Sequence, residues 1–390
     1  MLRRVTGDER STTSFPLQGY AFRPSPSEEA IANFLPYVTG ETTYVIEEGG
    51  AAVAAASAIP MRQHVRGVVL PMAGIAGVAS DPMARRRGHV RTLMDQLLGE
   101  MRDTGHVVSA LYPFRTSFYE RFGYAGLVKP RTVSFSPADL GAFVRRELPG
   151  EVRFEKIKQG YEDYRSLTLD LLARRHGFSV FPDFRAVRLR DLDERWLATA
   201  WVDGRVVGAV TYRITDYAGE LAADDLLTTS PLSRALLLQF FAKHVDQVSR
   251  VVATVAADET PELWATDLNV VLEGRVRLPA MNPPMARVLS IEALAGIAVG
   301  PGRVSVRIVG DPYVNGEYTL DGASGSLDVA RGSSSGPAAT VTAAGLSALV
   351  YGVRDPDEFG LYGLGDVPPD ACRELRSLFP RLLPYVFAQF

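Results

Sequence analysis

Hydrophobic and polar positions alternate along the first third of the chain in an order that predicts several strands and one helix. Gly49-Gly50 separates two strand-like runs, which is typical of a β-hairpin. Leu93 and Leu97 belong to a set of apolar residues spaced as on one helical face. The expected elements are a hairpin at 44–48 and 51–58, a long apolar strand at 68–80, a helix at about 86–103 and a buried strand at 107–112. A strand, a helix and a strand in this order predict a parallel α/β unit.

The same order recurs in the middle of the chain, and the pattern changes near Pro284. Asp203-Gly204 is a strong hairpin turn, and Asn315-Gly316 is one of several turn dipeptides in the last third. The middle elements are expected at 196–202, 206–214, near Leu226, 233–246 and 251–256. In the last third, alternating runs at 304–309, 318–320 and 327–329 predict an antiparallel sheet, followed by helices at 343–351 and 369–378.

These patterns predict a chain of α/β and α+β domains. At roughly 150 residues per domain, 390 residues suffice for two or three. We place a first α/β domain at 1–150, a second, related α/β domain at 151–284 and an α+β domain at 285–390.

Composition narrows the class of protein. Lys and Arg number 42 and Asp and Glu 45, which gives a net charge of −3, and no long block of one sign stands out. We therefore expect no nucleic-acid binding driven by phosphate contacts. The longest uncharged apolar stretch, 67–80, is shorter than the roughly 20 residues that span a bilayer, and the N-terminus lacks the apolar core of a secretory signal. Cys372 is the single cysteine and the histidines lack metal-binding spacing, so we expect a soluble, cytoplasmic protein without a metal.

The junction between the long apolar strand and the first helix carries the candidate chemistry. A helix N-terminus offers unpaired N–H groups and the positive end of the helix dipole, which suit a pyrophosphate. Three arginines add positive charge there, and Gly88 lets the backbone approach an anion closely. The alternative is that the arginines are only solvated, although cations oppose the dipole at that end. The candidate anion-binding residues are Val78, Ala79, Ser80, Arg85, Arg86, Arg87, Gly88, His89, Val90 and Arg91, with His89 expected to face solvent.

The spacing within this junction resembles a known motif. The pattern Pro82-x-x-Arg85-x-x-Gly88-x-Val90 resembles the acetyl-CoA loop of the GNAT superfamily of N-acetyltransferases. Val90 departs from that pattern, because Gly or Ala is usual at its position.

A second segment carries the same resemblance. Residues 117–124, Ser-Phe-Tyr-Glu-Arg-Phe-Gly-Tyr, resemble the element that follows the last core strand in many GNAT enzymes. In that superfamily a tyrosine here protonates the departing CoA thiolate, and the resemblance assigns this role to Tyr124, with Tyr119 in reserve. The alternative is that both tyrosines are core residues flanking a turn.

The order of the domains narrows the resemblance further. A first domain with Arg-Arg-Arg-Gly and Arg-Phe-Gly-Tyr, a second domain without the Arg-x-x-Gly signature and a third α+β domain are similar to the enhanced intracellular survival (Eis) group of acetyltransferases. The resemblance implies two GNAT-like mixed-sheet domains and a sterol-carrier-like domain. It also implies acetyl-CoA as the donor substrate and a small-molecule amine, such as an aminoglycoside, or a lysine as the acceptor. By analogy it implies a homo-oligomer, a hexamer.

The C-terminal segment 378–390 is apolar up to its last residue, whereas free tails are commonly polar. We therefore expect this segment to be buried. In the resembling group the terminal carboxylate reaches the active site of the first domain and acts as the general base, which assigns that role to Phe390. The alternative is a packed tail whose carboxylate meets an arginine. Gln389 is neutral where an acidic residue would favour a polycationic acceptor.

One helix start provides candidates for the acceptor side. Ser25 and Glu28 have the spacing of a capping box, with Pro26 in the first turn. In the resembling group this helix lines the amine pocket, which makes Glu28, Glu29 and Phe34 candidates.

Two other functions fit the same features. The first is a longer-chain acyl-CoA transferase, which also fits paired GNAT halves and a terminal carboxylate. The second is a lipid-binding or regulatory protein whose GNAT domain has lost transferase activity. Retention of both the Arg-x-x-Gly loop and Tyr124 argues against the second alternative.

Overall fold

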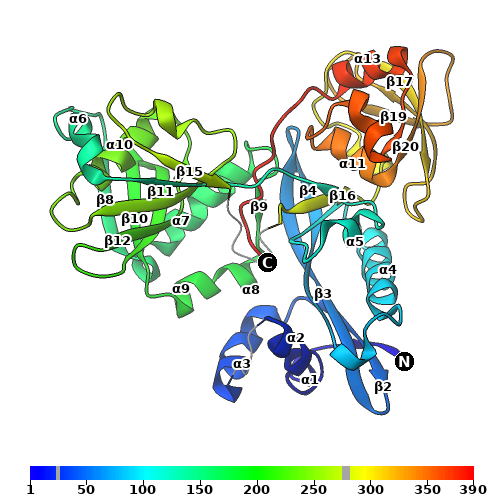
Figure 1. Cartoon of the computed structure of the whole chain (residues 1–390), viewed down its shortest axis with the longest axis horizontal. Helices are drawn as coiled ribbons and strands as arrows, with labels where there is room; N and C mark the ends of the chain where they lie inside the picture. The colour runs from blue at the N-terminus through cyan, green and yellow to red at the C-terminus, as the bar shows by residue number, and fades with distance from the viewer. Residues whose placement is uncertain (23–26, 275–281) are drawn as a thin grey trace. The chain divides into compact units, whose positions relative to one another are not determined.

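The computed structural model describes residues 1–22, 27–274 and 282–390, and the chain divides into two compact units. The first unit consists of Met1–Val128, Arg175–Ala186 and Arg277–Phe390, and the second of Lys129–Arg174 and Val187–Val276 (Figure 1). Each unit therefore combines segments that are far apart in sequence.

A mixed sheet forms the centre of the first unit. Its order is β1 (Leu2–Val5), β2 (Thr42–Glu48), β3 (Ala51–Val65), β4 (Val68–Ser80), β5 (Val108–Leu111), β16 (Met285–Val288) and β6 (Ala125–Gly126), and β9 (Ser179–Val180) pairs with β3. β4 and β5 are parallel, and the other pairs are antiparallel. Helix α4 (His89–Asp103) connects β4 to β5. It buries the predicted apolar face, Leu93, Met94, Leu97 and Leu98, and also Met101. The predicted hairpin and parallel α/β unit are confirmed.

Short helices pack around this sheet. They are α1 (Glu9–Thr12), α2 (Ser14–Phe22), α3 (Glu28–Phe34), η1 (Leu35–Val38), η2 (Pro82–Ala84), α5 (Thr116–Glu120) and α8 (Asp183–Ala186). α2 contacts β3 and β4, and α8 contacts η1. A segment from the middle of the sequence therefore lies against the N-terminal helices.

The second unit contains a sheet of the same mixed kind. Its order is β15 (Val271–Gly274), β7 (Arg131–Phe135), β14 (Arg250–Val255), β12 (Glu220–Asp225), β11 (Arg205–Ile214), β10 (Trp196–Val202) and β8 (Glu151–Lys156), and β13 (Leu227–Thr228) pairs with β11. β12 and β14 are parallel, as the repeated pattern predicts. The helices are η3 (Pro137–Leu140), α6 (Gly141–Val144), α7 (Ile157–Leu172), α9 (Arg188–Leu192), α10 (Pro231–Ala242) and η4 (Pro261–Leu263). None of the helices described in either unit combines the length and the apolarity that crossing a bilayer takes.

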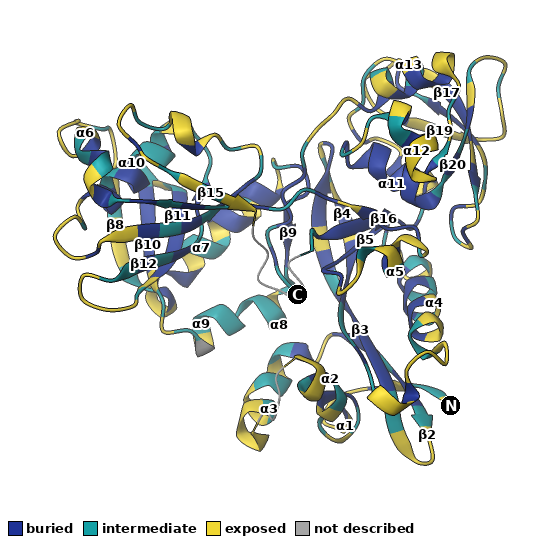
Figure 2. Ribbon diagram, in the orientation of Figure 1, coloured by how far each residue is buried: buried dark blue, intermediate teal, exposed yellow. Residues whose placement is uncertain are grey.

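A further sheet, which belongs to the first unit, follows near the C-terminus. Its order is β19 (Asp328–Arg331), β18 (Gly316–Asp321), β17 (Arg303–Val309), β20 (Ala338–Thr342) and β21 (Gly365–Asp366), with η5 (Glu292–Leu294), α11 (Ala343–Val350), η6 (Pro356–Glu358), α12 (Phe359–Tyr362) and α13 (Pro369–Leu378) beside it. Every residue of α11 is buried (Figure 2). The sheet is not purely antiparallel as expected, because β20 returns past β18 and β19 to pair with β17 in parallel.

Two strands cross the domain boundaries that we placed at 150 and 284. β7 lies within the expected first domain but pairs with β14 and β15 in the second unit. β16 begins the expected third domain but pairs with β5 and β6 in the first unit. Residues 175–186 also belong to the first unit. The sheets depart from the expected boundaries because an alternating pattern marks a strand without specifying its partner.

Candidate active site

The first sheet opens where β4 runs past β5. The two strands pair from Met72 and Val108 to Ile75 and Leu111, and β4 continues to Ser80. A cavity of about 1230 Å³ borders this opening, and each described residue that lines it belongs to the first unit. The predicted residues Val78, Ala79 and Ser80 line it.

A bulge in β4 shapes the opening. The pairing of β3 with β4 changes register between Ala55 and Ser57, and Gly77 on the opposite strand has a φ of +61°. The Gly77 carbonyl accepts a hydrogen bond of 2.9 Å from Gln18 Nε2. A Cβ atom at residue 77 would overlap with that amide, so the bulge requires glycine. This contact holds α2 at the edge of the cavity.

The start of α4 faces the same cavity. Gly88 is the N-cap, with a φ of +87° and no side-chain hydrogen bond capping the helix. A Cβ atom at Gly88 would meet nothing within 4 Å, so an anion has room to approach the first N–H groups of the helix. The predicted residues Arg85, Arg86, Gly88, His89, Val90 and Arg91 all line the cavity, and so does Arg121, which the sequence analysis did not select.

Two side chains at this loop lie elsewhere than expected. Arg87 does not line the cavity, because its exposed guanidinium donates to Glu48 Oε2 at 2.9 Å and to the Met83 carbonyl at 3.2 Å. His89 does not face solvent: its side chain is 14% exposed, and Nε2 lies 3.1 Å from Glu48 Oε1. Glu48, at the end of β2, therefore holds both side chains, a contact that local spacing does not reveal.

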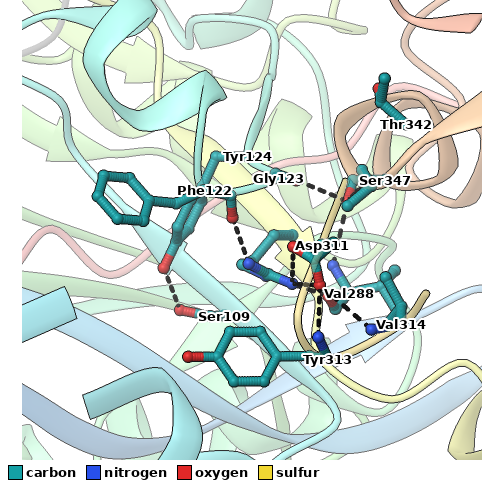
Figure 3. Close-up of polar contacts among 12 residues, drawn as sticks. Ser109, Phe122, Gly123, Tyr124, Val288, Asp311, Tyr313, Val314, Thr342 and Ser347 are labelled. Carbon is teal, nitrogen blue, oxygen red and sulfur yellow. Dashed lines mark hydrogen bonds and ion pairs between the residues drawn. The ribbon is translucent and has the colours of Figure 1, made fainter. Parts of the chain in front are cut away.

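The two candidate tyrosines have different surroundings. Tyr124 is fully buried, does not line the cavity, and its hydroxyl is hydrogen bonded to that of Ser109 at 2.7 Å (Figure 3). Tyr119, in α5, does line the cavity. Burial raises the pKa of both phenols, so both keep their protons at neutral pH. Of the two candidates, Tyr119 therefore borders the cavity, and Tyr124 lies behind its wall.

Most of the C-terminal tail is buried or partly buried as expected, although Pro380, Arg381 and Leu382 are exposed. Tyr112 donates a hydrogen bond of 3.2 Å to the Ala388 carbonyl, and the rings of Phe178 and Phe387 stack at 4.6 Å. The ring of Phe390 lies 5.5 Å from that of Tyr112 and lines the cavity. The tail thus brings its last residue to the wall that Tyr119 also forms.

Only some of the acceptor candidates on α3 line the cavity. Phe34 lines the cavity, whereas Glu28 and Glu29 are exposed and do not line it. Ser27 caps the helix by accepting a hydrogen bond of 3.1 Å from Ala30 N. The predicted capping residues Ser25 and Pro26 lie outside the described residues.

The sequence analysis missed a charged cluster in the cavity wall. Glu41 Oε2 lies 3.1 Å from Arg10 Nη2, and Glu41 Oε1 lies 3.2 Å from Arg185 Nη1. All three residues line the cavity. No local pattern could have identified them, because they come from α1, from the segment before β2 and from α8.

Comparisons with known proteins agree with this architecture. Residues 2–126 and residues 182–288 each match a family described as an acetyltransferase (GNAT) domain. The N-acetyltransferase Eis of Mycobacterium tuberculosis and that of Mycobacterium bovis are 40% identical to this chain over 77 residues, which are 20% of this chain and 19% of theirs. The matched segment therefore spans about a fifth of these curated relatives.

Solved structures show the same fold over the whole chain. A GCN5-related N-acetyltransferase from Kribbella flavida has a TM-score of 0.82 and 24% identity, covering 100% of this chain and 98% of that chain. Eis1 from Mycobacterium abscessus has a TM-score of 0.79 and 18% identity, covering 100% of both chains. Through its two matched acetyltransferase domains the chain belongs to the GNAT acetyltransferases, and it shares the fold of Eis1.

Proposed function

We propose that the protein transfers the acetyl group of acetyl-CoA to a primary amine. The acceptor classes to be tested are aminoglycosides, other small amines and lysine side chains. One observation carries the proposal: a single cavity joins the uncapped start of α4 to Tyr119 and Phe390. An anionic donor and two groups suited to proton transfer would meet there.

The donor would lie along the opening of the first sheet. Its pyrophosphate suits the start of α4, where the helix dipole and Arg85, Arg86 and Arg91 supply positive charge. The thioester would then lie beside residues 78–80, where a main-chain N–H of β4 would polarise its carbonyl.

The transfer needs no covalent enzyme intermediate. The acceptor nitrogen attacks the thioester carbonyl and loses a proton to a base, the carbon–sulfur bond breaks, and Tyr119 gives its phenolic proton to the departing CoA thiolate. In a chain that ends at Phe390, the α-carboxylate of that residue is the proposed base, since its ring lines the cavity.

Three further features rest on the resemblance to the Eis group. We extend the proposal to a sterol-carrier-like role for the C-terminal sheet as scaffold and pocket wall, to a homo-oligomer, a hexamer by analogy, and to a cytoplasmic location.

A thiol-release assay with a panel of amines tests the function, and two arginine variants test the donor site. Arg85→Gln should raise the acetyl-CoA KM roughly tenfold, because a charge-assisted contact to phosphate is lost. Arg87→Gln is the matched control, because Arg87 pairs with Glu48 outside the cavity, and its KM should not change.

Other outcomes would overturn the proposal. Equal KM values for the two variants would remove the donor from the start of α4. Faster thiol release from myristoyl-CoA than from acetyl-CoA would favour the longer-chain acyl transferase, and absence of any CoA binding would favour the lipid-binding or regulatory alternative.

A further inference from the structure

The part of the cavity wall formed by α1, the segment before β2 and α8 has an excess of positive charge. Arg10 and Arg185 both pair with Glu41, so two guanidinium groups share one carboxylate. The side chains of Arg10 and Glu41 are almost fully buried, and that of Arg185 is 15% exposed. Among the cavity-lining residues that the structure describes, Glu41 is the only one with an acidic side chain. Burial raises the pKa of Glu41 against the pull of the two arginines, and its protonation would only increase the positive excess.

The aromatic rings beside this cluster already hold cations. The Arg185 guanidinium lies 4.8 Å from the centroid of Phe34 and 5.7 Å from that of Phe181. The Arg10 guanidinium lies 4.8 Å from the centroid of Phe15. Aromatic faces are the usual uncharged partners of an ammonium group, but here they stack on the chain's own arginines. A polycationic acceptor would therefore meet repulsion from the arginines and little compensation from the rings.

The cluster lies next to the reacting end of the cavity. The ring of Phe181 is 6.3 Å from that of Phe390 and also contacts Arg185, so one aromatic residue connects the charged cluster to the end of the tail. The ring of Tyr112 also lies near Phe390, with the two ring centroids 5.5 Å apart. An acceptor whose amine is beside Phe390 would thus have an apolar wall around its body and Arg185 within reach of its far end.

We infer that the acceptor is an amine that also carries a carboxylate and an apolar body, such as an apolar amino acid or a short peptide acetylated at its amine. This inference rests on the proposed function and narrows its substrate class. The carboxylate pairs with Arg185, which offers the planar, forked donors that carboxylates prefer. The apolar body packs against Phe34 and Phe390. Aminoglycosides and polyamines are then poor acceptors, because they add positive charge to a wall that already carries an excess.

Matched amines test the inference on the full chain with saturating acetyl-CoA. Phenylalanine and phenethylamine differ only in the carboxylate, and tyrosine and tyramine form a second such pair. We expect kcat/KM to be roughly tenfold or more higher for the carboxylated member of each pair, and lowest for spermidine and kanamycin. Equal or better values for phenethylamine, tyramine or spermidine would overturn the inference.

Variants connect that preference to the cluster. Arg185→Gln should bring kcat/KM for phenylalanine down to the value that the same variant shows for phenethylamine, and Arg185→Lys should restore part of the preference. Arg190→Gln is the control, because Arg190 pairs with Asp191 outside the cavity. An undiminished preference in Arg185→Gln would refute the role of this residue. If Arg185→Gln fails to fold, the comparison of amines on the unaltered protein still decides the substrate class.

The two levels of failure are distinguishable. Acetyl-CoA binding by calorimetry without transfer to any amine would overturn the proposed function and the inference together. Transfer that favours amines lacking a carboxylate would overturn the inference alone.

Discussion

Tyr119 and Tyr124 have ring centroids 6.2 Å apart and similar burial, yet only one of them meets the cavity. Tyr119 is at the end of α5 and lines the wall, whereas the Tyr124 hydroxyl is bonded to Ser109, which in turn donates to the Ala73 carbonyl at 2.7 Å. Tyr124 thereby links the turn after α5 to β4 and β5. The proposed proton transfer to a thiolate therefore uses Tyr119, which borders the cavity.

Two phenylalanine substitutions separate these roles. Tyr119→Phe removes the proton and should lower kcat by about 100-fold, with the free energy of unfolding nearly unchanged. Tyr124→Phe should leave kcat within a few-fold but lower the free energy of unfolding by about 1 kcal/mol, because the buried bond to Ser109 is lost. Steady-state kinetics and urea unfolding of both variants measure this. The reverse pattern would return the acid to Tyr124.

Single residues show where sequence reasoning reached its limit. The loop motif selected Arg85 and Gly88, and both line the cavity, because a phosphate-binding motif is defined by local spacing at a helix start. The same motif could not exclude Arg87, whose direction is set by Glu48 on another strand. Arg185 gave no signal, since its partner Glu41 is distant in sequence.

At the scale of elements, turns and amphipathic faces were predictable and pairings were not. The Gly49-Gly50 hairpin and α4 follow from local conformational and apolar preferences. β7 and β16 were not predicted from the sequence, and each joins a sheet that its position in the sequence does not indicate. Such choices depend on packing between distant segments, which one sequence does not display.

His176 is hydrogen bonded to three segments of the first unit. Its Nδ1 accepts a hydrogen bond of 3.2 Å from Arg66 N, Nε2 donates to the Tyr351 carbonyl at 3.2 Å, and its own carbonyl accepts from Tyr385 N at 2.9 Å. It thus joins the β3–β4 turn, the end of α11 and the tail. Burial lowers the pKa of His176 to about 4, and the nearby Arg66 and His64 act in the same direction, against the bond to Tyr351.

This histidine should make stability depend on pH. The folded pKa is below the unfolded value of about 6.5, so the contribution of His176 is complete above pH 6.5 and is lost as the pH falls toward 4. We expect the free energy of unfolding to fall more steeply between these values in the unaltered protein than in His176→Gln, by up to about 1.4 kcal/mol per pH unit. Urea unfolding at several pH values measures both slopes, and parallel slopes would contradict the prediction.

The tail is a catalytic element if its carboxylate is the base. One glycine added after Phe390 would move that group by roughly 3.5 Å, and a misplacement of about 1 Å can cost about 100-fold in rate. The extended protein should bind acetyl-CoA normally, but its kcat should fall by at least about 100-fold. Deletion of Phe390 should have the same effect on kcat. A tag before Met1 is the control. Full turnover in both altered proteins would leave Glu41 or a water relay as the base.

At the scale of the whole molecule, a buried ion pair connects the C-terminal sheet to the active-site turn. Arg287, in β16, lies 3.1 and 3.0 Å from the two carboxylate oxygens of Asp311, between β17 and β18, and it also donates to the Phe122 carbonyl. Asp311 Oδ1 accepts from the main-chain N–H groups of Tyr313 and Val314 (Figure 3). Both charged side chains are nearly inaccessible to solvent. Phe122 follows α5, so this network also supports the position of Tyr119.

Removing one partner of this pair should affect both stability and turnover. Asp311→Ala leaves the Arg287 charge buried without its carboxylate and should lower the free energy of unfolding by about 3–5 kcal/mol. Arg287→Met combined with Asp311→Leu should recover most of that loss, because no unpaired charge remains.

Glu358→Ala is the matched control, because it breaks the half-exposed pair with Arg354 and should cost less than about 1 kcal/mol. Where Asp311→Ala remains folded, its kcat should fall about tenfold, because displacement of Phe122 moves Tyr119, the proposed proton donor. The acetyl-CoA KM should change little, because the start of α4 stays in place. Urea unfolding and steady-state kinetics measure both effects. If Asp311→Ala unfolds at the same urea concentration as Glu358→Ala, the pair does not hold the C-terminal sheet to the active-site turn.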